Sequence, residues 1–442
     1  EDVVGMDSAI LMHPKVWEAS GHVAQFHDLM VENKLTNKRY RLDQLLEGQA
    51  QPQVDQLAKD LGYPSEDGDS LVHVVIPRIL HAIVKENKTV DLSKYEFLDD
   101  ANRKKKGAAD WAIPRQFNLM FKTHVGPTED EAAATYLRPE TAQGIFVNFL
   151  NVQAAARAKL PFGIAQMGKA FRNEITTGNF LFRTREFEQM ELEFFVRPEH
   201  TTKWLEYWAD LRLNWYLELG VTPGKLRLRP HGKDELAHYS KACYDVEYQF
   251  PFMQQEDGGE GWGELEGIAD RGTYDLSQHQ EFSGKKLAFF DPELNRSVLP
   301  AVVEASAGVD RTVLTLLTDA YHEEEAPKAG GEGTEPRVVL RLAPALAPIT
   351  VAVFPLVNKD GMPEIARKLA DDLRGDLAAF YDAGGSIGRR YRRQDEAGTP
   401  FCVTIDGQTS EDQTVTVRDR DTLKQERVAL ERVEGYVRER ML

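Results

Sequence analysis

Two short segments bring together the side chains that recognition of a mononucleotide requires. The segment 171-FRNE-174 places Arg172 two residues before Glu174, and 183-RTREF-187 contains two arginines and Phe187. Arginine binds phosphate through a bidentate fork, a carboxylate accepts a hydrogen bond from an exocyclic amine, and an aromatic ring stacks on a base. ATP offers all three groups, so the pattern predicts an ATP site.

The elements that carry these residues are predicted to be two antiparallel strands within residues 171–195, joined at a Gly-Asn turn at 178–179. Residues two apart on a strand share a face, so Arg172 and Glu174 are expected to project together. On the returning strand, one face is expected to hold Arg183, Arg185, Phe187 and Glu191. A sheet surface of salt bridges is the alternative for any single Arg–Glu pair, but the phenylalanine among the charges favours a nucleotide site.

A phosphate-binding P-loop is a second interpretation of this region. The string 163-GIAQMGKAFRNE-174 holds Gly163, Gly168 and Lys169 at nearly the required spacing. A P-loop needs serine or threonine after the lysine to ligate magnesium, and this chain has Ala170 there. The loop should also lead into a helix, whereas the following residues alternate like strands. The P-loop is therefore rejected in favour of the hairpin.

The composition is typical of a soluble globular protein with two or three domains, since the 442 residues are 42% hydrophobic and 28% charged. The net charge of −17 argues against a general nucleic-acid coat protein. No apolar segment approaches the roughly 20 residues of a membrane helix. Cys243 and Cys402 are too few for a disulfide framework or a cysteine zinc site. A cytoplasmic protein without membrane association is expected.

Changes in composition and in hydrophobic pattern divide the chain into segments. Residues 41–110 are polar and are interpreted as an insertion, and the acidic, glycine-rich segment 322–337 is expected to be a mobile loop or linker. Beyond it, buried-strand patterns alternate with amphipathic helical ones, which is typical of a separate α/β domain. Strands are predicted at 349–357, 401–406 and 413–419, and helices at 362–374 and 421–441.

These strings resemble a known family. Residues 171–187 resemble motif 2 of class II aminoacyl-tRNA synthetases, and 304-EASAGVDR-311 resembles their motif 3. Four further strings are similar to the homodimeric glycyl-tRNA synthetase family: 14-PKVWEASGHVAQFHD-28, 115-RQFNLMF-121, 137-LRPETAQGIFVNF-149 and 262-WGELEGIADRGTYDL-276. Motif 2 alone indicates only the class, whereas the combination indicates the glycine family.

The resemblance implies an α+β fold. A class II synthetase-like catalytic domain, with an antiparallel sheet, flanking helices and insertions, is expected over residues 1–340. Its inserted regions are expected at about 41–110 and about 200–290. A C-terminal α/β anticodon-binding domain is expected over residues 341–442.

The resemblance also implies roles for individual residues. The catalytic residues are expected to be Arg172 and Arg311. ATP is expected to contact Arg172, Glu174, Arg183, Phe187, Glu304 and Arg311. Glycine is expected to contact Glu140, Arg172, Glu191, Glu304 and Ser306. Transfer RNA is expected to contact Arg390, Tyr391 and Arg393, for which a solvated turn is the alternative. Magnesium is expected to arrive with ATP, with Glu304 as the candidate protein ligand.

The implied function is that of a ligase that activates glycine with ATP and transfers it to the 3′ end of tRNA(Gly), releasing pyrophosphate and AMP. A non-catalytic, nucleic-acid-binding accessory subunit is one alternative, but such proteins tend to lose the arginines that Arg172, Arg183 and Arg311 match. A class II synthetase for another amino acid is the second alternative. A homodimer is expected from the resemblance alone, because the Tyr-Gly-Pro stretch of motif 1 is not found in this sequence.

Overall fold

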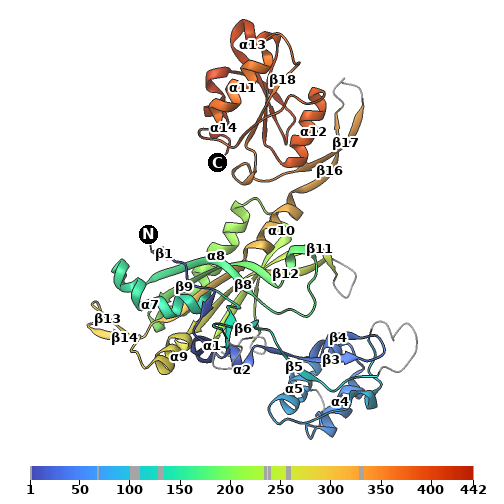
Figure 1. Ribbon diagram of the computed structural model, residues 1–442, viewed down its shortest axis with the longest axis vertical. Coiled ribbons are helices and arrows are strands. Elements are labelled where there is room, and N and C mark those ends of the chain that lie inside the picture. The colour runs from blue at the N-terminus through green and yellow to red at the C-terminus, as the bar shows by residue number, and fades with distance from the viewer. Residues whose placement is uncertain are drawn as a thin grey trace. The chain divides into compact units, whose positions relative to one another are not determined.

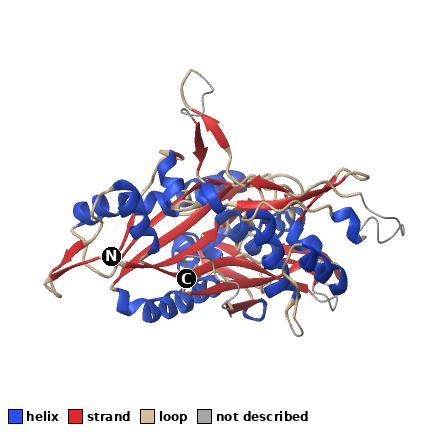
Figure 2. Ribbon diagram, turned by 90° about the horizontal axis from the view of Figure 1, so that it is seen from below, coloured by secondary structure: helices blue, strands red, loops and turns tan. Residues whose placement is uncertain are grey.

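The computed structural model describes residues 2–66, 69–99, 110–127, 134–232, 236, 240–254, 260–327 and 333–441. The chain divides into two compact units. The first comprises Glu1–Trp208, Arg229–Asp245 and Glu266–Asp310, and the second comprises Ala209–Leu228, Val246–Leu265 and Arg311–Leu442. Both units contain helices and strands. Figure 2 colours the helices blue and the strands red. In the described ranges, no helix combines the length and the apolar character needed to cross a membrane.

A seven-stranded sheet carries the segments that resemble motifs 2 and 3 (Figure 1). Its strands lie in the order β1 (Val3–Gly5), β8 (Phe162–Phe171), β9 (Glu186–Val196), β15 (Ala301–Gly308), β12 (Glu260–Gly272), β11 (Ala242–Gln254) and β10 (Leu226–Pro230). The pairs β8–β9, β9–β15 and β15–β12 are antiparallel, while β1 is parallel to β8. The predicted antiparallel sheet of an α+β fold is confirmed.

Helices pack an aromatic core against one end of this sheet. They are α7 (Ala142–Ala156) and α9 (Tyr274–Ser283), and α1 (Pro14–Ala19) contacts both of them. The ring of Phe149 on α7 lies 4.5 Å from that of Phe195 and 5.9 Å from that of Phe162, between centroids. Burying each such ring contributes about 1.5–3 kcal/mol relative to exposing it. This packing fixes the first turn of α7, and with it Thr141, against the sheet.

The β8–β9 hairpin is confirmed, but its connecting loop is longer than predicted. Strand β8 ends at Phe171 and β9 begins at Glu186, so Arg183 and Arg185 lie in the loop and not on the strand. Asn179 and Phe180 have φ angles of 54° and 55°. These left-handed conformations interrupt the extended backbone, which the alternation of side chains alone did not reveal.

The first inserted region forms a module with its own core. Its sheet has the order β4 (Lys38–Arg41), β3 (His27–Asn33) and β5 (Arg115–Asn118), all antiparallel. Its helices are α3 (Leu42–Glu47), α4 (Gln51–Asp60) and α5 (Ile76–Val84), with shorter turns at Leu71–Val75 and Leu92–Tyr95. Leu46, Ile79 and Trp111 belong to its buried core. The module therefore begins before residue 41, at β3.

The second region predicted as an insertion, about 200–290, is only partly separate. It begins with α8 (Thr201–Glu218), but β10, β11 and β12 are strands of the large sheet. The remaining elements before the C-terminal region are α2 (His22–Gln25), β2 (Leu11–Met12), β6 (Lys122–His124), β7 (Ala134–Leu137), β13 (Phe289–Asp291), β14 (Arg296–Val298) and α10 (Val309–Ala320).

The C-terminal region contains a five-stranded mixed sheet with helices around it (Figure 1). Its strand order is β19 (Ala379–Tyr381), β18 (Val351–Pro355), β20 (Phe401–Ile405), β21 (Thr414–Asp419) and β22 (Gln425–Ala429). Its helices are α11 (Met362–Leu373), α12 (Ile387–Ala397), α13 (Gly407–Asp412) and α14 (Val433–Arg438). The predicted final helix at 421–441 is wrong in its first half, because residues 425–429 pair with β21 as an edge strand.

The acidic segment after residue 321 is a ribbon where a loop was predicted. Strand β16 (Tyr321–Pro327) pairs antiparallel with β17 (Thr334–Leu340), and residues 328–332 lie outside the described ranges. Glu324 faces Arg337 across the ribbon, with a 2.6 Å ion pair, and also binds Arg341 at 2.6 Å. Because Arg337 and Arg341 neutralise Glu324, the ribbon forms despite the acidic composition.

A buried ion network joins this ribbon to α12. The Asp395 carboxylate is fully buried and accepts from Arg337 at 2.8 Å and from both terminal nitrogens of Arg418 at 2.9 and 3.0 Å. Removing one partner of such a network leaves an uncompensated buried charge.

The variant Asp395→Ala is therefore expected to lower the free energy of unfolding by about 3–5 kcal/mol. A matched control is Asp376→Ala, since Asp376 forms an exposed 2.8 Å ion pair with Arg438. The control is expected to cost at most about 1 kcal/mol. Chemical denaturation of both variants checks the difference, and equal losses would contradict the role given to the network.

Candidate active site

One face of β9 carries four polar or aromatic side chains in a row, because they alternate along the strand: Phe187, Gln189, Glu191 and Glu193. On β15, Ser306 lies opposite Glu191 and Glu304 lies opposite Glu193. The flanking strands place small residues beside this row. They are Gly168 and Ala170 on β8 and Gly267 and Ala269 on β12. Small residues lie beside only part of the row, because Gln166 and Ile164 on β8 lie opposite Glu191 and Glu193, and Arg138 fills the space beside Gly168.

Glu191 is the most densely hydrogen-bonded member of the row. One carboxylate oxygen accepts from the Thr141 backbone nitrogen at 2.8 Å and from the Thr141 hydroxyl. The other accepts from Gln189 Nε2 at 2.6 Å and from Ser306 Oγ at 2.9 Å. Four donors from three elements thus hold this buried carboxyl in one orientation.

A β-bulge brings an arginine to the row. On β12, Asp270 lies opposite Val303 and Gly272 lies opposite Val302, so Arg271 is the bulged residue of the β12–β15 register. Its guanidinium is buried and donates to Glu304 at 2.6 Å and to both oxygens of Asp275 at 2.7 and 2.8 Å. The bulge therefore places the guanidinium of a strand residue among the carboxylates, where it supplies the positive charge of the site.

Glu140 completes the cluster from the segment before α7. Gln143 Nε2 donates to its Oε1 at 2.9 Å, and His22 Nε2 lies 3.4 Å from its Oε2. Burial favours the neutral acid, but the charge and hydrogen bond of His22 and the charge of Arg271 outweigh it, so the pKa of Glu140 is lowered. Glu140 is therefore ionised at neutral pH.

The pKa values of Glu191 and Glu140 are shifted in opposite directions. Burial and the charges of Glu304 and Glu140 raise the pKa of Glu191 to about 8, although hydrogen bonds from Thr141 and Ser306 oppose the rise. Burial also raises the pKa of Glu304, against the charge of Arg271. Carboxyls crowded in a buried site cannot all ionise, so this cluster favours a cationic ligand that would let them do so.

The predicted nucleotide residues lie at the open end of the same row. The Arg172 guanidinium lies 5.4 Å from the Phe187 ring centroid and 5.7 Å from that of Phe26, and its Nε donates to the Pro139 carbonyl at 3.1 Å. Pro139 precedes Glu140, so the arginine lies next to the carboxylate cluster. Glu174 is half-buried after β8, and Arg183 is exposed in the loop.

Arg311 belongs to the second unit, on α10. Its Nη1 donates to the Glu264 carbonyl at 2.6 Å within that unit. Its predicted contact with ATP remains a prediction.

The glycines of the near P-loop have packing roles. A side chain at Gly168 would overlap Nη2 of Arg138, and one at Gly163 would lie 2.7 Å from Leu192 Cδ1. Buried Arg138 donates to the Lys169 carbonyl at 2.6 Å and to the Ser8 carbonyl at 2.8 Å. The segment 162–171 is strand β8, which confirms that it is not a P-loop.

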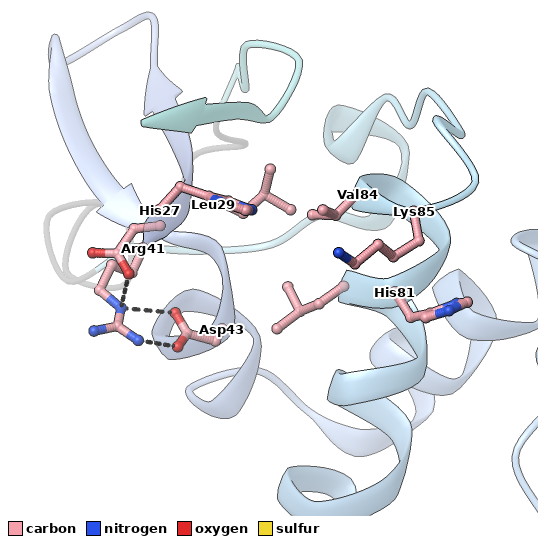
Figure 3. Close-up of a pocket in the computed structure, with 9 residues that line it drawn as sticks. His27, Leu29, Arg41, Asp43, His81, Val84 and Lys85 are labelled. Atoms are coloured by element: carbon pink, nitrogen blue, oxygen red, sulfur yellow. Dashed lines mark hydrogen bonds and ion pairs between the residues drawn. The ribbon is translucent and has the colours of Figure 1, made fainter. Parts of the chain in front are cut away.

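A cavity of about 300 Å³ lies in the inserted module (Figure 3). It is lined by His27, Asp28, Leu29, Arg41, Asp43, Leu80, His81, Val84 and Lys85. Arg41 closes one side through ion pairs with Asp43 at 2.5 Å and Asp28 at 3.7 Å. Burial raises the pKa of Asp28, and the charges of Arg41 and Arg183 act against the rise. The cavity is thus linked electrostatically to the loop that carries Arg183.

One further group among the described residues has metal-ligand chemistry. His231, Cys243 and Asp245 place one donor atom each within 4.8 Å of one another. His231 Nε2 lies 2.6 Å from Asp245 Oδ2, and Arg229 Nη2 donates to the same oxygen at 3.1 Å. A guanidinium on that carboxylate disfavours a second cation, so we interpret the group as a hydrogen-bonded cluster.

The predicted tRNA residues lie on α12 in different surroundings. Arg390 is only 2% exposed and donates to the carbonyls of Pro355 and Gly385, so the structure gives it a structural role in place of the predicted RNA contact. The Tyr391 hydroxyl lies 2.7 Å from Thr404 Oγ1. Arg393 has a half-exposed side chain and binds Asp382. The solvated turn considered for this segment is a helix.

Sequence patterns missed four residues of the cluster: Thr141, Gln189, Arg271 and Asp275. Arg271 and Asp275 lie in 262-WGELEGIADRGTYDL-276, so the family-like string marked their position but not their role. Their i, i+4 spacing indicates an ion pair only within a helix, whereas Arg271 lies on strand β12 and Asp275 on helix α9, so the spacing was not a usable signal. The sequence also gives no signal for the bulge at Arg271, because one extra residue hardly disturbs the alternation of apolar and polar residues along a strand.

Comparisons with known proteins give the family of this chain. A family model described as an anticodon binding domain matches residues 350–440. The chain is 47% identical over 442 residues to a protein named glycine–tRNA ligase from Nocardia farcinica and 49% identical over 442 residues to one from Thermobifida fusca. Each match covers 100% of this chain and 86% of the relative. A third, from Caldanaerobacter subterraneus, is 49% identical over 438 residues. The chain therefore belongs to the glycine–tRNA ligase family.

Proposed function

We propose that this protein activates glycine with ATP and transfers it to the 3′ end of tRNA(Gly). The observation that carries this proposal is the buried cluster of Glu140, Glu191 and Glu304 around Arg271, next to Arg172. A carboxylate oxygen of glycine attacks the α-phosphorus of ATP, the bond to the β-phosphate breaks, and pyrophosphate leaves. A terminal ribose hydroxyl of tRNA then attacks the carbonyl carbon, and AMP leaves.

Glycine has no side chain, so a site cannot select it by burying apolar surface. In the proposed complex, Glu191 and Glu304 accept hydrogen bonds from the ammonium, with Glu140 and Ser306 beside them. Selectivity comes from excluding larger amino acids, because a β-carbon would meet walls that already hold fixed hydrogen bonds. Arg172 is proposed to offset the negative charge of the glycine carboxylate, which attacks the α-phosphorus of ATP.

No general base is needed, because the glycine carboxylate is already a nucleophile at neutral pH. The work of the site is alignment and charge compensation at the α-phosphate. In the proposed complex, Arg172 contacts the α-phosphate, Phe187 stacks on adenine, and Glu174 accepts from its exocyclic amine. Arg183 and Arg311 are proposed for the γ-phosphate. Magnesium is proposed to come with ATP, as the family generally uses it.

We do not assign magnesium to Glu304, which was its predicted ligand. The Glu304 carboxylate accepts from Arg271 at 2.6 Å in buried surroundings. The Arg271 guanidinium would repel a divalent cation at this carboxylate about twice as strongly as it repels the single charge of the glycine ammonium.

We propose residues 1–340 as the catalytic domain and 341–442 as the anticodon-binding domain. A homodimer and a cytoplasmic location remain proposals from the family resemblance. In the C-terminal domain, parallel β18 and β19 end at Pro355 and Tyr381, and ligands of such sheets bind beyond these ends. Exposed Phe380 and Arg393 lie in this region and suit stacking on bases and binding of phosphate.

The variant Arg393→Glu is expected to weaken tRNA binding about tenfold, because a charge-assisted phosphate contact is replaced by repulsion. Glycine-dependent exchange between ATP and pyrophosphate is expected to stay unchanged, since it needs no tRNA. The control Lys368→Glu makes the same change of charge at an exposed position of α11. Filter binding at fixed salt compares the two. Equal loss in both variants would point to a general charge effect and contradict the contact.

The KM for glycine is expected to fall as the pH rises from 6.5 to 8.5. Because the pKa of Glu191 in the empty site is about 8, the ammonium must displace a proton at lower pH. Below that pKa the ionised fraction falls about tenfold per pH unit. A KM that is constant over this range would contradict the assignment of Glu191.

The same shift has a consequence for stability. A carboxyl whose pKa is raised by folding stabilises the protein below its ordinary pKa, and this contribution is lost as the pH rises toward 8. Bound glycine should offset the loss, so the increase in Tm on adding glycine should be larger at pH 8.5 than at pH 6.5.

Exchange of labelled pyrophosphate into ATP tests the proposed function. The purified protein is assayed with glycine, proline, threonine, histidine and no amino acid. Exchange that requires glycine is expected. No exchange with any amino acid would favour the accessory subunit, and exchange with one of the others would favour a different class II synthetase.

A further inference from the structure

Glu193 is the deepest acid of the β9 row, and the proposed mechanism does not use it. Its side chain is fully buried, and no N–H or O–H group of the described residues donates to either of its carboxylate oxygens. The next residue of the row is Phe195, which belongs to the aromatic core with Ile164 and Val302. An unpaired carboxylate at the edge of that core would be costly, so its charge state requires explanation.

The partner that explains it is Glu304. The two residues are Cα partners on adjacent antiparallel strands, so their side chains leave the same face of the sheet side by side. Glu304 is held in an ion pair with Arg271 at 2.6 Å. Two neighbouring carboxyls in buried surroundings retain one proton between them.

The surrounding charges place that proton on Glu193. Burial first, and then the charge of Glu304, raise the pKa of Glu193 well above its usual range, and Arg271 only partly opposes this. Arg271 binds Glu304 directly, which favours the ionised form there. The titratable and charged groups that face the pair are Glu191 on β9, Arg271 on β12, Asp275 on α9 and Glu140 before α7. On β8, the residue opposite Glu193 is Ile164, which carries no charge.

We propose that Glu193 is a positioning residue, a neutral acid that donates its carboxyl hydrogen to the Glu304 carboxylate and so orients Glu304 toward the glycine ammonium. The inference rests on the proposed function of the site. Glu304 would then be held by two donors from opposite neighbours, Arg271 on β12 and Glu193 on β9. Because Glu193 is neutral, it adds no further negative charge to the site. A negative charge there would attract Arg271 away from Glu304 and Asp275.

Two substitutions of similar size separate this role from simple packing. Glu193→Gln keeps a hydrogen-bond donor, so the KM for glycine is expected to stay within about threefold of the parent, less than the loss of one hydrogen bond. Glu193→Met fills the space without a donor, and the KM for glycine is expected to rise about tenfold or more, as for the loss of a hydrogen bond to a charged group. The KM for ATP is expected to remain unchanged in both. Glu188→Gln, at an exposed position of β9, is the matched control.

An infrared difference spectrum gives a second readout that packing would not change. The parent protein minus Glu193→Gln, both saturated with glycine at neutral pH, is expected to show the carbonyl band of one protonated carboxylic acid. Absence of that band overturns the proposal, as does a Glu193→Met variant with the parent's KM for glycine. If the parent shows no glycine-dependent exchange, the proposed function itself fails. If the parent does exchange and only these results fail, the role of Glu193 alone is wrong.

Discussion

The variant Arg172→Ala is expected to lower the rate of glycine-dependent ATP–pyrophosphate exchange by about 10²- to 10³-fold, the usual effect of removing a group that compensates transition-state charge. Arg172 lies against the Phe187 ring and next to the Pro139 carbonyl, so its guanidinium is held at the junction of the proposed nucleotide and glycine sites. Because it is proposed to contact both reacting groups, its loss should affect kcat as well as KM.

The control for this substitution is Arg296→Ala, which removes an exposed arginine of β14. Exchange by the control is expected to match the parent within about twofold, as for surface positions outside a site. Circular dichroism and Tm establish that both variants are folded. If Arg172→Ala keeps the parent's exchange rate, the nucleotide must bind elsewhere.

Glu191→Ala and Glu304→Ala are each expected to spare folding and to reduce kcat/KM for glycine by at least about 10²-fold, because each removes a charge-assisted hydrogen bond from the ammonium. Both variants leave donors without an acceptor. In Glu191→Ala these are Thr141, Gln189 and Ser306. In Glu304→Ala they are Arg271 and the proposed carboxyl hydrogen of Glu193. A loss of about 1–3 kcal/mol of stability is therefore expected beside the kinetic effect.

Measuring the Kd for ATP distinguishes a loss of glycine recognition from a general loss of stability. If only glycine recognition is lost, the Kd for ATP stays near that of the parent. Glu186→Ala, at the exposed start of β9, controls for the removal of a strand glutamate. Unchanged exchange kinetics in both Glu191→Ala and Glu304→Ala would refute the assignment of glycine to this cluster.

The strand alternation in 186–196 was sufficient to place Phe187 and Glu191 on one face, because side-chain period is fixed by the extended backbone. The same rule failed for Arg183 and Arg185. They lie in a loop with two left-handed residues, of which Asn179 belongs to the predicted Gly-Asn turn, while Phe180 has no such signature in the sequence. The prediction was correct where hydrogen bonding along the ladder fixes the backbone and wrong where local turn geometry does.

The remaining predictions failed because residues that are distant in the sequence contact one another in the fold. The segment 322–337 has the composition of a linker, yet Glu324 and Arg337 pair across a ribbon and Arg337 also binds buried Asp395. Arg390 looked like part of a basic RNA-binding run, but its two terminal nitrogens donate to backbone carbonyls inside the domain. Charge and composition describe a segment by itself, whereas burial depends on partners that are distant in sequence.

The most direct test of the central claim is a crystal structure with a non-hydrolysable sulfamoyl mimic of glycyl-adenylate. The predicted result places the ammonium within hydrogen-bond distance of Glu191 and Glu304, the sulfamoyl group at Arg172, and adenine against Phe187. An ammonium bound away from these carboxylates, or a mimic bound elsewhere on the protein, would contradict the account.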